Sequence, residues 1–227
     1  MLVRLATRTG LLALLLSLST GCTSLEKVDL GRVLTSGRDG WQHPEKVIEA
    51  LELAPGDRVA EIGAGDGYWL PWLSDAVGPD GVVYAVEVDD ELVAALNERV
   101  ADEELGNVVV VRGQFADPEL PDGEIDLAMT CLTYHHIDDR ARYFERLRVD
   151  LSERGRVAHL DDRPGTGAPF RWFQSKDHWS EPEAIVGEMR EAGYRRVASF
   201  DLLPAQSFQV FAPVQGDVAA SDPVEGH

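Results

Sequence analysis

Residues 61–68 read EIGAGDGY and place three glycines at alternate positions, directly after the apolar run RVAEI at residues 58–62. Glycines at the end of a buried strand indicate a turn whose backbone approaches a ligand or a packed helix closely. A dinucleotide-binding loop has the spacing GxGxxG and holds a pyrophosphate at the next helix N-terminus. The spacing here is GxGxG, and the carboxylates of Glu61 and Asp66 disfavour a pyrophosphate. The loop therefore favours a ligand with an ammonium or sulfonium group over NAD, and an NAD-dependent oxidoreductase is disfavoured.

Outward from this loop, strand and helix patterns alternate along the chain. Strands are predicted at residues 58–62, 81–88, 107–113, 124–132 and 155–161, with a strand pair at 194–213. Helices are predicted at residues 43–53, 68–77, 89–104, 138–151 and 180–193, the last with Ser180 and Glu183 as a capping box and Gly193 at its end. This alternation predicts parallel βαβ units and a doubly wound α/β sheet. Ligands of such sheets bind beyond the carboxyl ends of the strands.

Composition narrows the classes of partner. The chain has 227 residues, enough for one α/β domain, and its formal charge of −19 repels phosphate backbones, so a nucleic acid partner is disfavoured. Its two cysteines, Cys22 and Cys131, exclude a disulfide framework, and the histidines have no metal-ligand spacing, so no metal site is predicted. Nothing in the sequence indicates an oligomeric state.

The first 22 residues have the layout of an export signal: two arginines, no acid, a short apolar run and small residues before Cys22. The run is too short for a comfortable membrane span. LSTGC resembles the bacterial lipobox, although Ser19 stands where leucine is usual. We expect a lipoprotein signal peptide at 1–21, a lipid on Cys22 and a location in the cell envelope, or a cytoplasmic protein if the segment is not processed. A tether and cap at 22–40, a main domain at 41–213 and a disordered tail at 214–227 complete the expected organisation.

Further polar residues follow the next two strands. Glu87 ends the second strand, twenty residues after Gly67, where a carboxylate can accept hydrogen bonds from both hydroxyls of a ribose. Gln114, Phe115 and Asp117 follow the third strand, where they can face an adenine by stacking or by accepting from its amino group. Taken singly these are weak signals, because an acid after a strand is often a helix N-cap. On consecutive strand ends they together predict a site for a nucleoside.

At this point the chain resembles the class I S-adenosylmethionine-dependent methyltransferases, from about residue 41 to residue 211. The resemblance rests on VAEIGAGDGY, GVVYAVEVDDELVAAL, NVVVVRGQFADPELPDGEIDLAMTCLTYHHI and GRVAHLD. It implies a Rossmann-like seven-stranded sheet, mostly parallel with an antiparallel last strand, S-adenosylmethionine as cofactor, and methyl transfer to an acceptor that we expect to be a small molecule. Gln114 departs from the acid that family members often carry there, and LSERGR replaces the usual Gly-Gly turn before the fifth strand.

The resemblance also assigns parts of the cofactor to residues. The methionine portion is assigned to Glu61 and the glycine loop and the ribose to Glu87, with Val88 as a further cofactor contact. The adenine is assigned to the segment after the third strand. The full set of expected cofactor contacts is Glu61, Gly63, Ala64, Gly65, Gly67, Glu87, Val88, Gln114, Phe115 and Asp117.

Methyl transfer is expected near residues 130–138, TCLTYHHID. His135 and His136 are candidate general bases, because a histidine titrates near neutral pH. The alternative is that one packs under the cofactor and the other caps the helix that follows. Tyr134 is either a substrate contact or a packing residue, and Cys131 is expected to be an inert core residue. Residues 163–179 and 37–45 are interpreted either as lids over the site, the latter with Trp41 and Gln42 near the cofactor, or as surface packing.

The expected location in the cell envelope leaves a second hypothesis about function open. S-adenosylmethionine is made in the cytoplasm, whereas a lipoprotein is exported. The leading hypothesis is a methyltransferase for a small molecule. The alternative is an envelope-anchored ligand-binding protein that keeps the methyltransferase fold without turnover.

Overall fold

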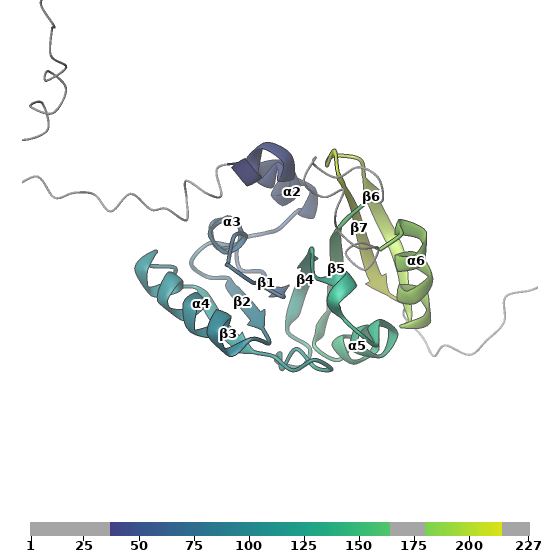
Figure 1. Ribbon diagram of the computed structural model, residues 1–227. Helices are drawn as coiled ribbons and strands as arrows, with labels where there is room; N and C mark the ends of the chain where they lie inside the picture. The colour runs from purple at the N-terminus through teal and green to yellow at the C-terminus, as the bar shows by residue number, and fades with distance from the viewer. Residues whose placement is uncertain (1–36, 164–179, 215–227) are drawn as a thin grey trace, which may run out of the picture.

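The computed structural model describes residues 37–163 and 180–214, which form one seven-stranded sheet with helices on both faces (Figure 1). The strands are β1 (Arg58–Ile62), β2 (Val82–Glu87), β3 (Val108–Arg112), β4 (Ile125–Cys131), β5 (Leu151–Asp162), β6 (Tyr194–Phe200) and β7 (Gln206–Pro213). Their spatial order is β3-β2-β1-β4-β5-β7-β6. Strands β1 to β5 pair in parallel, and β7 runs antiparallel between β5 and β6. The predicted doubly wound sheet with an antiparallel last strand is confirmed.

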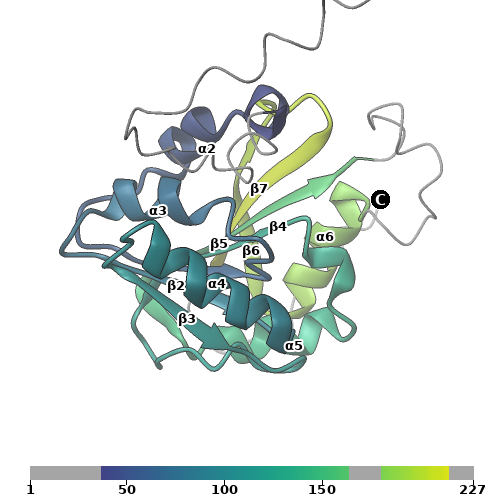
Figure 2. The same cartoon turned by 60° about the vertical axis from the view of Figure 1, so that its left-hand side comes forward.

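The helices cover the sheet in two groups, visible in the turned view of Figure 2. They are α2 (Pro44–Leu51), α3 (Leu70–Val77), α4 (Asp90–Asp102), α5 (Arg140–Leu147) and α6 (Pro182–Glu191), with a short 3₁₀ helix η1 (Tyr134–His136) after β4. Successive strand residues point to opposite faces. Val59 therefore packs in the cluster of α2, α3 and α4, and its neighbour Ala60 packs in the cluster of α5 and α6.

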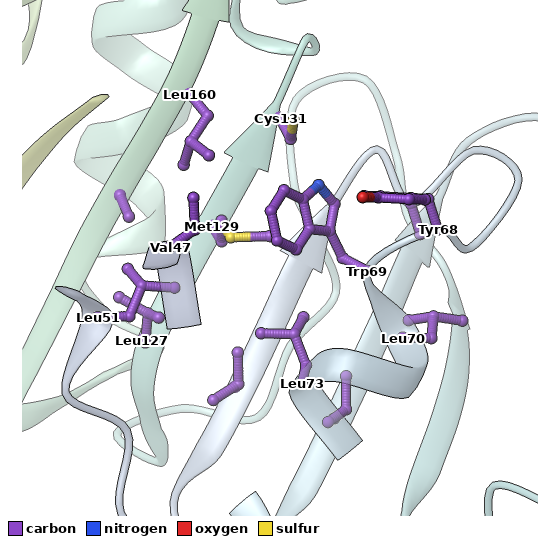
Figure 3. Packing of buried hydrophobic residues seen from close by; sticks show 14 of the residues in the cluster. Val47, Leu51, Tyr68, Trp69, Leu70, Leu73, Leu127, Met129, Cys131 and Leu160 are labelled. Carbon is purple, nitrogen blue, oxygen red and sulfur yellow. The ribbon is translucent and has the colours of Figure 1, made fainter. Parts of the chain in front are cut away.

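Trp69 lies at the centre of the first cluster, beside the glycine loop. Its indole is fully buried and meets the Tyr68 ring edge-on at a centroid distance of 5.2 Å. Figure 3 shows the indole between Tyr68 and Met129, with Cys131 close by at the end of β4. The residues that follow the loop in sequence thus anchor it in the core.

Two predicted boundaries need correction around residues 148–155. The predicted helix 138–151 ends at Leu147, because residues 148–150 form a tight turn in which Asp150 N–H donates to the carbonyl of Leu147. The fifth strand begins at Leu151 rather than at Gly155, since Leu151 is buried and pairs with Ile125 on β4. The register shifts between Ile125 and Leu127, so LSERG is an irregular strand entry in place of the expected turn.

The predicted capping box of α6 is wrong. Pro182 occupies the first turn and Glu181 the N-cap, and no side chain caps this end. Proline starts a helix well because it lacks the N–H that would need a cap. Gly193, with φ of +83°, does follow the last turn as predicted, and its N–H donates to the carbonyl of Arg190.

Residues 37–42 are helical and precede α2. The signal segment with Cys22, residues 164–179 of the expected lid 163–179, and the tail from residue 215 lie outside the described residues, so their predictions stay predictions. Within the described part of the chain, no helix has the length and apolarity needed to cross a membrane.

Candidate functional site

A cavity of about 700 Å³ lies at the carboxyl ends of β1, β2 and β4. Between β1 and β4 the chain reverses its direction of travel across the sheet, and ligands of doubly wound sheets bind at this point. The wall comes from the loops after β1, β2, β3 and β4, from the helical segment 37–42 and from the start of α5. Its size is typical of a site for a small organic ligand or cofactor.

The three glycines of the loop have three different roles. A Cβ on Gly63 would collide with the side chain of Thr133, so this glycine lets the loops after β1 and β4 touch. A Cβ on Gly65 would meet nothing closer than 4.0 Å, and this residue lies in the cavity wall. A Cβ on Gly67 would lie 2.9 Å from Leu96 of α4 and 3.0 Å from Leu70, and Gly67 is outside the wall. Gly63, Ala64 and Gly65 therefore face the cavity, whereas Gly67 serves helix packing.

Glu61 is a buried carboxyl group in the cavity wall. The residue is 3% exposed, and its Oε2 atom has no hydrogen-bond partner among the described residues. Burial raises the pKa of Glu61 well above its usual value, while the nearby charge of Arg38 acts in the opposite direction. A buried carboxyl oxygen without a partner is costly unless a ligand completes it, so this end of the cavity fits a cationic donor such as an ammonium group.

Glu87 holds the end of β2 against the glycine loop. Its Oε1 accepts from the N–H groups of Val88 at 2.7 Å and Asp89 at 3.2 Å, and its Oε2 accepts from Gly65 N–H at 2.9 Å. The residue is 7% exposed and lies in the cavity wall together with Val88. Three backbone donors thus fix a carboxylate at the position where the sequence predicts a ribose contact.

Of the three residues predicted after β3, two line the cavity and one does not. Gln114 and Phe115 lie in the wall, and Phe115 is 80% exposed at its rim. Asp117 is outside the wall, because its carboxylate accepts from Arg146 Nε at 2.8 Å and its backbone pairs with that of Gln114. The expected contact of Asp117 with a ligand is thus replaced by a structural ion pair, which shapes the turn that carries Gln114 and Phe115.

Of the three catalytic candidates, the structure brings only His136 to the cavity wall. His135 points away, with its Nδ1 atom 2.8 Å from Asp161 Oδ1 at the end of β5. Neither histidine caps α5; Asp139 is the N-cap and accepts from Arg142 N–H at 3.4 Å. The ring centroids of the two histidines are 4.1 Å apart.

Tyr134 is fully buried below the cavity, in a network that sequence reasoning missed. Its hydroxyl donates to Glu188 Oε2 at 2.6 Å, and Arg140 donates to both oxygens of Glu188, at 2.7 and 3.0 Å. The loop after β4 is therefore fixed to α6 through Glu188. Tyr134 packs and positions this loop, and it does not line the cavity.

The helical segment 37–42 contributes one wall residue, Arg38, that the sequence did not single out, whereas Gln42, expected near the cofactor, is buried outside the wall. Arg38 lies in the wall, and buried Gln42 donates to Cys131 Sγ at 3.0 Å and to Gln206 Oε1 at 3.1 Å. Cys131 also lies in the wall, and burial raises the pKa of its thiol. Arg38 is ninety-three residues before Cys131 in sequence, and no motif marks it, so only the fold reveals that it belongs to the site.

Comparisons with known proteins agree with this geometry. Residues 59–155 match the methyltransferase domain family. A solved S-adenosylmethionine-dependent methyltransferase from Aquifex aeolicus superposes with a TM-score of 0.70 at 26% identity, over 82% of this chain and 98% of that one. The fold is therefore the class I methyltransferase fold, and S-adenosylmethionine is the cofactor that these similarities support.

Curated relatives match over shorter stretches. The protein-L-isoaspartate O-methyltransferase of Ignicoccus hospitalis is 40% identical over 67 residues, which is 30% of this chain and 32% of that protein. The nocamycin O-methyltransferase of Saccharothrix syringae is 29% identical over 109 residues, 46% of this chain and 39% of that protein. The matches thus span only 32% and 39% of these relatives' lengths. They support a methyltransferase and leave the acceptor open.

Proposed function

We propose that this protein is an S-adenosylmethionine-dependent methyltransferase that acts on a small-molecule acceptor. The observation that carries the proposal is the pair of buried carboxyl groups, Glu61 and Glu87, in the wall of one cavity at the carboxyl ends of adjacent strands. Glu61 offers an uncompensated oxygen and Glu87 a fixed carboxylate. Such a pair suits a ligand with a cationic group at one end and hydroxyls further along.

The residues in the cavity wall fit S-adenosylmethionine, which carries an ammonium group at one end and ribose hydroxyls further along. Glu61 would accept from its ammonium group and Gly65 would let its chain pass close to the backbone. Glu87 would accept from the ribose hydroxyls, and Gln114 and Phe115 would border the adenine. Asp117 and Gly67 take no part, since the first is paired with Arg146 and the second packs on α4.

When bound, S-adenosylmethionine supplies an electrophilic methyl group. The contribution of the chain is to align the acceptor and to exclude water, which accounts for most of the acceleration expected for transfer to a good nucleophile. Leu132, Thr133 and His136 form the wall at the end of β4, where we place the acceptor. His136 would take the proton that an acceptor loses, and Asp161 orients the neighbouring His135.

The acceptor class rests on charge and on size. With a formal charge of −19, the protein would repel nucleic acid, and the cavity of about 700 Å³ has a size typical of a site for small organic ligands. The name of the nocamycin O-methyltransferase refers to a small-molecule acceptor. We therefore favour a small molecule over a protein or a nucleic acid.

Binding and turnover are tested separately. Titration calorimetry of the full chain should show binding of S-adenosylmethionine and S-adenosylhomocysteine, and no binding of either would refute the proposal. Incubation with methyl-labelled S-adenosylmethionine and a small-molecule extract should then give labelled small molecules and S-adenosylhomocysteine. Binding with no label transfer to any fraction would favour the second candidate, a binding protein that keeps the fold without turnover.

The second candidate is favoured by the layout of residues 1–22, from which we propose a lipid anchor at Cys22 and a location in the cell envelope. Mass spectrometry of the membrane fraction should find an acylated N-terminal peptide that begins at Cys22. A protein that keeps Met1 and stays in the soluble fraction would exclude the anchor and favour a cytoplasmic enzyme.

A further inference from the structure

We propose that Arg38 binds the carboxylate of the amino acid portion of the cofactor, so that the cavity selects ligands with a complete zwitterionic amino acid. This inference rests on the proposed function and adds a specificity residue to it. It also gives the helical segment 37–42 a part in ligand recognition, because Arg38 is its only cationic residue.

The position of Arg38 relative to Glu61 is the first argument. The ammonium and carboxylate groups of an amino acid are bonded to the same carbon atom, so the protein groups that bind them must adjoin. Arg38 and Glu61 both line the cavity, and Arg38 Nη1 lies 3.4 Å from Asp66 Oδ1 in the glycine loop that follows Glu61. The positive charge of Arg38 also opposes the effect of burial on the pKa of Glu61. Arg38 therefore meets the requirement, whereas the wall's other arginine, Arg142, comes from α5 after β4.

The fixed geometry of the guanidinium is the second argument. Arg38 Nε donates to Gln42 Oε1 at 2.6 Å, and the guanidinium carbon lies 4.1 Å from the centroid of the Tyr68 ring. Gln42 is itself fully buried and bonded to Cys131 and Gln206. An arginine held by one nitrogen and by a ring face presents its remaining N–H groups in a planar fork, which suits a carboxylate.

The present partner of that fork is replaceable. Arg38 Nη1 lies 3.4 Å from Asp66 Oδ1, and the Asp66 side chain is 62% exposed. A long, exposed ion pair contributes little, so the carboxylate of a ligand can displace Asp66 at small cost. Asp66 thus occupies the place that we assign to the ligand's own carboxylate.

The experiment uses two ligands that differ only in this group, S-adenosylmethionine and its decarboxylated form. Both keep the sulfonium, the ribose, the adenine and the ammonium group. For the full-length protein with Arg38→Gln, calorimetry should show at least about a tenfold loss of affinity for S-adenosylmethionine. Affinity for the decarboxylated ligand should change by less than about twofold, which also shows that the variant is folded.

Two further variants make the assignment specific. Glu61→Gln should weaken both ligands, since both carry the ammonium group. Arg195→Gln, an exposed arginine on β6 far from the cavity wall, should weaken neither. Equal losses for the two ligands in Arg38→Gln, or a carboxylate-dependent loss in Arg142→Gln instead, would overturn the assignment. Wild-type protein that binds neither ligand would refute the proposed function itself, which separates the two failures.

Discussion

The backbone N–H of Gly65 donates to Glu87 Oε2 at 2.9 Å, so the glycine loop after β1 is bonded to the end of β2 by a carboxylate that also faces the cavity. One side chain thus shapes the loop and is available to the ligand. Loss of Glu87 should therefore affect both stability and binding.

Replacing Glu87 by glutamine should lower the free energy of unfolding by about 1–3 kcal/mol, because an amide NH₂ would face backbone N–H donors. The same variant should bind S-adenosylhomocysteine at least about tenfold more weakly. Urea unfolding and calorimetry measure the two effects. Glu98→Gln, an exposed acid on α4, is the matched control and should change neither. A fully stable Glu87→Gln protein with normal affinity would contradict the dual role.

Alanine substitutions should separate the roles of the glycines. Gly63→Ala should destabilise the protein by about 2–4 kcal/mol, since the new methyl group meets Thr133 and the residue has φ of +73°. Gly65→Ala should cost about 1–2 kcal/mol, from its positive φ alone, as its Cβ would have space.

A double-mutant cycle checks the cause of the larger loss. Thr133→Ala in the Gly63→Ala background should recover part of the stability, whereas the same change should not improve Gly65→Ala. Additive effects in the Gly63 and Thr133 pair would show that the contact is not responsible.

Ligand binding should depend on pH through Glu61. Burial raises the pKa of this carboxyl in the ligand-free protein, and a bound ammonium group would lower it again. Affinity for S-adenosylmethionine should therefore rise with pH until Glu61 is ionised in the free protein, and binding below that pH should release a proton. Calorimetry in buffers of different ionisation enthalpy detects that proton. Glu61→Gln should bind more weakly and release none, and a Glu61→Gln protein that still releases it would show that another group titrates.

Stability should fall in acid because of His159, which is fully buried with Thr130 Oγ1 2.8 Å from its Nδ1. Burial lowers the pKa of His159 from 6.5 to about 3. In the unfolded chain His159 is protonated below about pH 6.5, whereas in the folded protein it stays neutral until about pH 3. The contribution of His159 is thus complete above pH 6.5 and is lost by up to about 1.4 kcal/mol per pH unit towards pH 3.

The test compares unfolding free energies of wild type and His159→Gln across this range. Glutamine can keep a hydrogen bond to Thr130 but does not titrate, so the difference between the two proteins should shrink as the pH falls. A constant difference would mean that His159 is not the acid-sensitive group.

Tyr134→Phe tests the structural role of the catalytic candidate that lies below the cavity. Removing the hydroxyl deletes its bond to Glu188 while Arg140 still pairs with that carboxylate, so unfolding should become easier by about 1 kcal/mol. Affinity for S-adenosylhomocysteine should change by less than about twofold, because Tyr134 is outside the wall. A Tyr134→Phe protein with unchanged stability and tenfold weaker binding would show that Tyr134 contacts the ligand.

The order of strands and helices could be predicted because apolar residues recur at a spacing typical of a helix or of a strand, depending on the face that the element buries. The strand RVAEI and the amphipathic helix after Glu87 are examples. The start of the fifth strand at Leu151 could not be predicted, since it depends on pairing with Ile125, which lies twenty-six residues earlier. Ser180 is not a cap because the helix begins at Pro182, which has no N–H to be capped, and Glu181 takes the N-cap position.

The sequence by itself determined the class of the sheet, the glycine loop and the acids at the ends of the first two strands, since these depend on local period and on spacing along one chain segment. Only the tertiary structure decided which polar residues share the cavity. It removed Asp117, which Arg146 binds, and His135, which faces Asp161, and it added Arg38 from the cap. The direction of a side chain depends on partners that are distant in sequence, and no local pattern records them.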